Sequence, residues 1–437
     1  MPTRQAEQTA AAGRPWTPPR RRFFYGWVVV AVSFITMFLV IGTRFSLGIF
    51  YVAILEEYHW TRAETAGAFS LMLAVHAVFS LGVGVLFDRL GPRKLFPLGA
   101  LAIALGFAAC SQIRSIWQLY VFLGLLAAIG TSSLAFVPHM ALVSTWFVRR
   151  RGMATGIAYS GIGGGMLILA PLIQLVIATY GWRMAFGLLA LTIFSVVVPL
   201  TALFQRRRPQ DLGLYADGLP PESAATGSGP ATAVVAHDWT LREVLRTRHF
   251  WYLMATVAGM GMNLNTLSVH QMAHLTGVGY SKMLGATLTG LVGGMRSLGG
   301  TLLGSLSDRI GRAATYTLGS ALAFAGVALL ASIQDTGQPW RVYGFVVLYG
   351  LGYGALGPIY AAATADRFPG RSLGTILGVL EAGYGLGGAF GTYMAGYLYD
   401  HSGSYTISLY LVLGAIVGSC AALWGSTAGS ARPARTS

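Results

Sequence analysis

The chain has 437 residues, of which 54% are hydrophobic and only 10% are charged, and its formal net charge is +15. Ordinary soluble domains carry about 25% charged residues, so this composition excludes a soluble globular protein, and its apolar content excludes a disordered one. Both cysteines, Cys110 and Cys420, lie inside apolar runs, which argues against a disulfide-stapled secreted domain. An integral membrane protein is the class that remains.

Twelve apolar runs are long enough to cross a membrane as helices, which takes about 20 residues each. Lipid-exposed strands with open edges could not satisfy their backbone groups, so we predict an all-α membrane protein. The first run is longer than the core of a signal peptide and lacks a small-residue cleavage site. The first six spans are expected near 25–51, 64–86, 95–112, 116–142, 153–178 and 183–204, and the last six near 250–272, 283–306, 313–333, 341–363, 373–398 and 404–425.

Lysine and arginine residues lie mainly on one side of these spans. With both termini in the cytoplasm, the tails and inner loops hold 23 of the 30 basic residues, and the outer loops hold five. The remaining two, Arg44 and Arg296, lie inside spans. This asymmetry follows the positive-inside rule, so the basic excess indicates membrane orientation and not nucleic-acid binding. The short loops favour a bacterial inner membrane.

One long connection divides the chain into halves. The middle of residues 205–249 is rich in Gly, Pro, Ser and Ala, as flexible linkers are, and Thr240-Leu-Arg-Glu243 at its end fits a capping box that predicts a short surface helix. The expected domains are a cytoplasmic tail 1–24, a six-helix bundle 25–204, a cytoplasmic linker 205–249, a second six-helix bundle 250–425 and a cytoplasmic tail 426–437.

The two halves repeat each other at an offset of 220 residues. Gly84-x-x-x-Asp88-Arg89-x-Gly91 follows the second span, and Gly304-x-x-x-Asp308-Arg309-x-Gly311 follows the eighth. Residues 60–62 match 280–282 at the same offset, and residues 151–155 match 371–375. A six-plus-six duplication explains these agreements, so the twelve helices should form two pseudo-symmetric bundles.

The first of these loops, extended to Arg93 and Lys94, resembles the signature loop of the major facilitator superfamily. Its glycines permit close helix approach, and its charges could latch the ends of neighbouring helices; the expected latch residues are Gly84, Asp88, Arg89, Gly91, Arg93, Asp308 and Arg309. Three more segments resemble the monocarboxylate and oxalate/formate branch: Trp146-Phe147-x-x-x-Arg151-Gly152, residues 208–214 and Arg296-x-x-Gly299-Gly300. The resemblance covers nearly the whole chain and implies a carboxylate substrate, with Arg296 as its anion partner.

The sequence departs from that branch at two places. Val292 stands where animal monocarboxylate carriers place an aspartate one turn before the arginine, so their proton-coupling scheme does not transfer. Glu381 and its neighbours stand where oxalate exchangers have a lysine in the eleventh span. A second cation for a dicarboxylate is therefore missing at that position.

Charged residues at membrane depth are candidates for function, because their insertion costs about 2.5–3.5 kcal/mol at the span centre. Arg296 lies midway along the eighth span and can bind a carboxylate bidentately. Glu381 is the one acidic residue well inside a predicted span, and with His270 it is a candidate for proton coupling. The alternative for Glu381 is a structural ion pair with Arg296 or Arg44.

Further polar residues of the spans are candidate substrate ligands. The 220-residue offset aligns His76 with Arg296, so the two could face one cavity, although a neutral histidine bonded within its helix is equally consistent. Arg44, with His270, is expected to ring the outer vestibule, or to snorkel to the interface. Asn263, Asn265 and Tyr353 could donate hydrogen bonds to the substrate, or serve helix packing.

These features predict a secondary transporter and not an enzyme. No Gly-Lys dipeptide occurs, and the two Gly-x-Gly-x-x-Gly patterns do not follow strands, so no nucleotide, other cofactor or metal is predicted. We expect a monomer in the lipid bilayer that moves a small monocarboxylate by alternating access, with proton symport or exchange for a counter-anion. The alternatives are a multidrug or metabolite exporter driven by proton antiport, and a non-transporting membrane sensor.

Overall fold

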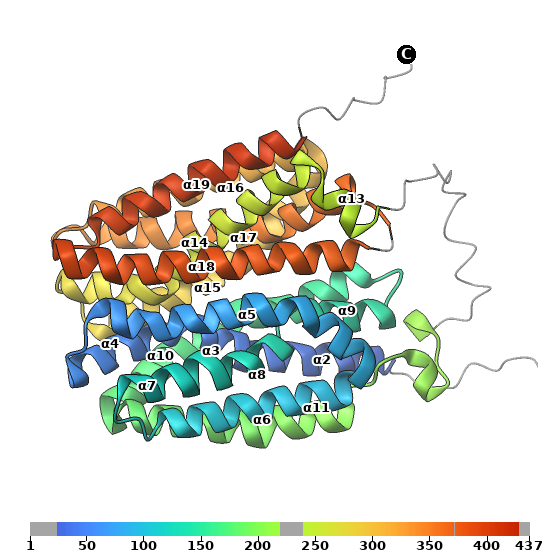
Figure 1. Ribbon diagram of the computed structural model, residues 1–437, viewed down its shortest axis with the longest axis horizontal. Coiled ribbons are helices and arrows are strands. Elements are labelled where there is room, and N and C mark those ends of the chain that lie inside the picture. Colours follow the sequence, from blue (N-terminus) through green and yellow to red (C-terminus); the bar gives the residue numbers. More distant parts are fainter. Residues whose placement is uncertain (1–23, 219–238, 371, 428–437) are drawn as a thin grey trace, which may run out of the picture.

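The structure is a computed structural model that describes residues 24–218 and 239–427, apart from residue 371 and the side chain of residue 308. Within these ranges every regular element is a helix. The helices before the linker form one layer and the helices after it form another, all roughly along one long axis (Figure 1). The all-α fold predicted from the sequence is confirmed.

The first half holds six spans, several of them interrupted. Gly181, with φ +83°, breaks α10 between the fifth and sixth spans. The first span consists of α2 (Gly26–Thr36), the π-helical η1 (Met37–Ile41), α3 (Gly42–Phe45) and α4 (Leu47–Tyr58), and the second and third spans are α5 (Arg62–Leu90) and α6 (Pro92–Cys110). The fourth span consists of α7 (Ile116–Leu119), the π-helical η2 (Tyr120–Ala127), α8 (Ala128–Ser133) and α9 (Phe136–Trp146). The fifth and sixth spans are formed by α10 (Arg151–Thr192), the π-helical η3 (Ile193–Val197) and α11 (Val198–Phe204).

The second half is more regular. The described part of the linker contains the turns η4 (Pro209–Leu212) and η5 (Ala216–Gly218) and the surface helix α13 (Leu241–Leu245), whose predicted capping box between Thr240 and Glu243 is confirmed. Residues 219–238, most of the stretch predicted to be flexible, lie outside the described residues. The six spans are α14 (Arg248–Gly277), α15 (Lys282–Ile310), α16 (Arg312–Ala331), α17 (Pro339–Arg367), α18 (Leu373–Ser402) and α19 (Thr406–Thr427).

The outer surface of the bundle is apolar. In the described part of the chain, nine helical runs are long and apolar enough to cross a membrane, and one of them, Arg151–Phe204, contains the break at Gly181 and so provides two spans. The remaining two spans, α14 and α15, are also long enough to cross a membrane, but they carry more polar side chains than these nine runs. Large apolar residues such as Val78 (70% exposed) and Trp117 (73% exposed) would be poorly placed in water and fit a lipid environment. The chain is a multi-pass membrane protein.

The halves meet mainly along two helix pairs, α5 with α18 and α10 with α15, and α4 also contacts α14. Figure 1 shows α5 and α18 side by side at the boundary between the layers. Small residues allow this close approach: a Cβ atom on Gly385 of α18 would lie 2.8 Å from the Ala77 side chain of α5, and one on Gly163 of α10 would lie 2.5 Å from the Gly293 carbonyl of α15. The second span therefore packs against the eleventh and the fifth against the eighth, so each pair joins a span of one half to the repeat counterpart of the other pair's first-half span.

The halves are closed against each other at the end opposite the linker, here called the far end. The Asp400 carboxylate of α18 accepts hydrogen bonds from the backbone N–H groups of Arg62 (3.0 Å) and Ala63 (2.7 Å), which begin α5. Arg62 also donates to the Tyr405 hydroxyl at 2.7 Å, and Lys282 pairs with Glu56. A negative charge at a helix N-terminus is stabilising, so Asp400 joins the two halves.

Replacing Asp400 with Ala is expected to loosen the far end. A charge at an exposed helix N-terminus contributes about 1 kcal/mol, so the population with an open far end should rise about fivefold. The measurement is the rate at which a membrane-impermeant maleimide labels Ser70→Cys, in a background with Cys110 and Cys420 replaced by Ala. The Ser70 hydroxyl contacts the Ala389 carbonyl between α5 and α18.

The matched control for Asp400→Ala is Glu64→Gln, because Glu64 caps the same helix start from within the first half. Its labelling rate should stay at the parental value. An Asp400→Ala rate equal to that of the control would show that the carboxylate does not hold the halves together.

Replacing Gly354 with Ala is expected to destabilise the bundle. A Cβ atom there would lie 2.1 Å from the Arg296 carbonyl oxygen, so α17 and α15 would have to separate. Overpacking of this kind costs about 1–3 kcal/mol, which should lower the melting temperature in detergent. Gly357→Ala in the same helix is the control, because its Cβ atom would meet nothing within 4 Å. Equal melting temperatures for the two variants would contradict the packing argument.

Candidate functional site

A cavity of about 470 Å³ lies between the two halves. Its wall reaches Gly152 and Thr155 in the first turns of α10, at the linker end, so the cavity opens toward that end. Five of the residues predicted from the sequence line it, contributed by α3, α5, α15, α17 and α18: Arg44, His76, Arg296, Tyr353 and Glu381. Tyr159, Tyr360 and Tyr384 add further polar groups to its lining.

Arg296 is buried in this wall, with 8% of its surface exposed. Its guanidinium carbon lies 4.8 Å from the centre of the Phe45 ring and 5.2 Å from that of Tyr353, and Nη1 lies 3.6 Å from the Met166 sulfur. Its Nε atom is buried without a hydrogen-bond partner. Among the described residues, no acidic side chain forms an ion pair with it. The cavity therefore presents a buried positive charge that aromatic faces stabilise only in part.

Arg44 contributes a second cation to the same cavity. It follows the π-helical η1, an irregularity of the kind frequent at functional sites. Its Nη2 atom is buried without a hydrogen-bond partner, and its charge is within electrostatic range of Glu381 and Tyr384. The structure thus places Arg44 in a cavity open at the linker end, together with Arg296, and not in an outer vestibule with His270.

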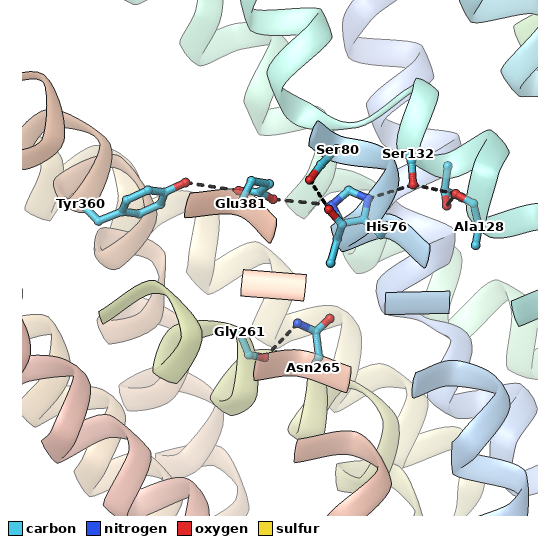
Figure 2. A network of polar contacts seen from close by, with 10 residues as sticks. His76, Ser80, Ala128, Ser132, Gly261, Asn265, Tyr360 and Glu381 are labelled. Atoms are coloured by element: carbon cyan, nitrogen blue, oxygen red, sulfur yellow. Dashed lines mark hydrogen bonds and ion pairs between the residues drawn. The ribbon is translucent and has the colours of Figure 1, made fainter. Parts of the chain in front are cut away.

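His76 and Glu381 face each other across the boundary between the halves (Figure 2). The His76 Nε2 atom lies 3.7 Å from Glu381 Oε1, and the Tyr360 hydroxyl donates to Glu381 Oε2 at 3.3 Å. On its other side, His76 Nδ1 lies 3.1 Å from the Ser132 hydroxyl, which donates to the Ala128 carbonyl. Among the described residues, Glu381 forms no ion pair with Arg296 or Arg44, which was the structural alternative left open by the sequence, and its partner is His76.

Three predicted residues lie away from the cavity wall. Asn263 accepts a hydrogen bond from the Tyr349 hydroxyl at 3.1 Å, and the Asn265 amide donates to the Gly261 carbonyl at 2.9 Å (Figure 2). His270 lies nearer the far end, where its ring nitrogens contact the Thr392 carbonyl at 2.9 Å and the Tyr405 hydroxyl at 3.2 Å. All three are buried; Asn263 and His270 make hydrogen-bond contacts to neighbouring helices, and the Asn265 bond lies within α14.

The predicted latch residues lie at the linker end. Asp88 pairs with Arg207 at 3.1 Å and so joins α5 to the linker, and Arg93 donates to the Ala202 carbonyl at 3.1 Å and so joins α6 to α11. Gly91 takes a positive φ of +70° at the turn between α5 and α6, which favours glycine. Gly84, Arg89 and Arg309 are exposed, and the Asp308 side chain lies outside the described residues.

Several residues that line the cavity or contact its charged side chains were not predicted from the sequence. Phe45 and Met166 contact Arg296, and Ser132 contacts His76, yet each belongs to a residue type that is common throughout the spans. The small residues Gly42, Thr43 and Ser46 beside Arg44 are the sequence signal that could have marked this helically irregular segment. The contacts themselves depend on which helices are neighbours.

Comparison with known proteins gives a consistent assignment. The family profile of the Major Facilitator Superfamily matches residues 33–392 and 297–435. Monocarboxylate transporter 13 of Bos taurus is 28% identical over 407 residues, covering 90% of this chain and 87% of the relative. Monocarboxylate transporter 11 of Homo sapiens is 29% identical, covering 94% and 84%. The uncharacterized MFS-type transporter YcxA of Bacillus subtilis (strain 168) is 24% identical, covering 90% and 91%. The chain belongs to the Major Facilitator Superfamily and is a membrane transporter of a small-molecule substrate, not an enzyme.

Proposed function

We propose that this transporter moves a small monocarboxylate across the membrane by alternating access. The observation that carries the proposal is Arg296: a buried guanidinium that lines the cavity, with Nε unpartnered and no acidic residue of the described chain paired to it. A carboxylate bound bidentately would supply the missing negative charge. The names of the relatives from Bos taurus and Homo sapiens support the same substrate class.

The remaining cavity groups would orient the substrate. Arg44 would add positive potential, and the Tyr353 ring, whose hydroxyl is held by the Met260 carbonyl at 3.2 Å, would fix the Arg296 guanidinium. Apolar residues such as Phe136, Met140 and Leu264 would contact the substrate body. Asn263 and His270 would act indirectly, by holding α14 against α17 and α18, and Asn265 by its hydrogen bond within α14.

The orientation in the membrane follows from the distribution of basic residues. The linker end carries most of them, so this end and both termini would lie in the cytoplasm, in a bacterial inner membrane. The cavity would then be open to the cytoplasm, and the far end would be the closed outer gate. Asp88, Arg93 and their partners would hold the inner helix ends of the first half together as the halves rock.

Transport would be coupled either to a proton or to a counter-anion. Glu381 and His76 are the titratable pair in the cavity and would carry the proton in a symport mechanism. In an anion exchanger, it would be enough that the two halves cannot change conformation while the cavity is empty and the charge of Arg296 is not neutralised. The first scheme predicts accumulation driven by a pH gradient, and the second predicts uptake that depends on internal substrate.

Arg296→Ala is expected to abolish uptake, because the substrate carboxylate loses its bidentate partner. Losing charge-assisted hydrogen bonds of this kind should lower the affinity for the substrate by about 100-fold. The measurement is the uptake of radiolabelled small acids into proteoliposomes, with and without an imposed pH gradient. Arg296→Lys should retain a small fraction of the activity, because lysine keeps the charge without the planar fork.

The matched control is Arg114→Gln, which removes an exposed arginine from a far-end loop and should transport normally. Uptake by Arg296→Ala at the wild-type level would contradict the proposal. If no acid accumulates and cationic dyes leave the vesicles in a manner abolished by Glu381→Gln, the multidrug exporter alternative replaces it.

A further inference from the structure

The Ser132 hydroxyl determines which nitrogen of His76 carries hydrogen. It donates its only hydrogen to the Ala128 carbonyl at 2.7 Å, and its oxygen lies 3.1 Å from His76 Nδ1. A hydroxyl whose hydrogen is already used can offer the ring only a lone pair, so Nδ1 must be the N–H donor. His76 is 2% exposed and Ser132 is 1% exposed, so water does not compete for either contact.

The other ring nitrogen then faces an acid. In the neutral Nδ1–H form, the lone pair of Nε2 points to Glu381, whose Oε1 atom is 3.7 Å away, and Nε2 has no other partner (Figure 2). A lone pair facing an ionised carboxylate is repulsive, whereas one proton between them is attractive. This proton gives either imidazolium with carboxylate or imidazole with carboxylic acid, and both forms hold the same number of protons.

We propose that Ser132 is a positioning residue that fixes the Nδ1–H tautomer of His76, so that His76 and Glu381 together bind one transported proton. That the bound proton is transported rests on the proposed function, whereas the assignment of the His76 tautomer does not. Ser132 itself lies outside the cavity wall and touches neither substrate nor proton. It acts through the imidazole.

The charged groups around the pair explain why one proton and the substrate would bind together. Arg44 on α3 and Arg296 on α15 line the same cavity and oppose additional positive charge on the pair. A substrate carboxylate on Arg296 would offset this opposition, so substrate and proton would each favour binding of the other. The other titratable groups lining the cavity are tyrosine hydroxyls: Tyr159 on α10, Tyr353 and Tyr360 on α17, and Tyr384 on α18.

The shared proton also connects the two halves of the protein. His76 belongs to α5 and Glu381 to α18, the helices that pair across the boundary. Loss of the proton replaces an attraction between these helices with a repulsion. Proton release would therefore weaken the boundary that must rearrange during alternating access.

The direct test is nitrogen-15 NMR of the full-length protein in lipid, labelled at its eight histidines, with His76 assigned by comparison with His76→Gln. The expected result is a protonated Nδ1 in His76 throughout a titration from about pH 5 to pH 9, with only the Nε2 resonance moving. In Ser132→Ala, neutral His76 should become a mixture that includes the Nε2–H form. A wild-type His76 that is neutral in the Nε2–H form would overturn the inference.

The transport test uses the pH dependence of net uptake in proteoliposomes. In Ser132→Ala, neutral His76 can adopt the Nε2–H tautomer and donate this hydrogen to ionised Glu381. This hydrogen bond stabilises the state of the pair that has released the shared proton. The midpoint of proton-dependent uptake should therefore fall by about one pH unit. Ser132→Thr, which can keep the same bond to the Ala128 carbonyl, should restore the wild-type profile.

Ser133→Ala is the matched control, because Ser133 is the adjacent buried serine and its hydroxyl donates to the Ile129 carbonyl at 3.0 Å. Its uptake profile and its His76 resonances should match wild type. The positioning role of Ser132 would be rejected if Ser132→Ala had the same uptake midpoint as Ser133→Ala and the tautomer of its His76 were unchanged. If the NMR result is as expected but no acid is transported, the tautomer assignment stands and the proposed function fails.

Discussion

The arrangement of this protein depends on keeping the Arg296 guanidinium charge buried between the two halves, where no acidic side chain of the described residues pairs with it. Placing such a charge in a low-dielectric interior is costly unless other groups replace the lost water. Phe45 and Tyr353 present aromatic faces to Arg296, and the Met166 sulfur contacts it, but these groups leave the positive charge in place. The cavity is thereby complementary to an anion. A carboxylate in the substrate would complete the electrostatics that the chain itself leaves incomplete.

Close helix packing allows this charge to lie where it does. Gly354 of α17 lies against the backbone of Arg296, and Gly299 of α15 lies against the Leu351 carbonyl, so these two helices are in direct backbone contact. Apolar side chains would pack no better against lipid than against protein, so small residues and van der Waals contact supply the association that water supplies elsewhere. The glycine-rich sequences that imitate nucleotide motifs have this structural use.

The proposed proton site and the closed far end lie along the same boundary between the halves. The far end is closed by Asp400 at the start of α5, while the cavity stays open toward the linker. Between these two ends, His76 and Glu381 connect α5 with α18. Because the same helices carry the closed far end and the titratable pair, a change in protonation would act directly on the contact that the proposed alternating access must break and remake.

The sequence by itself was sufficient for the fold class, the positions of the spans and the repeat between the halves, because bilayer thickness dictates span length and duplication leaves matching loops. It also singled out Arg296 and Glu381, since charges at membrane depth are rare and costly. It left the partner of Glu381 open between Arg296 and Arg44, and the structure shows His76 instead. It did not separate the residues that line the cavity from His270, which contacts Thr392 and Tyr405 nearer the far end. Only the tertiary structure decided these contacts, because they depend on how each helix is rotated about its axis and which helix lies beside it, and apolar composition fixes neither.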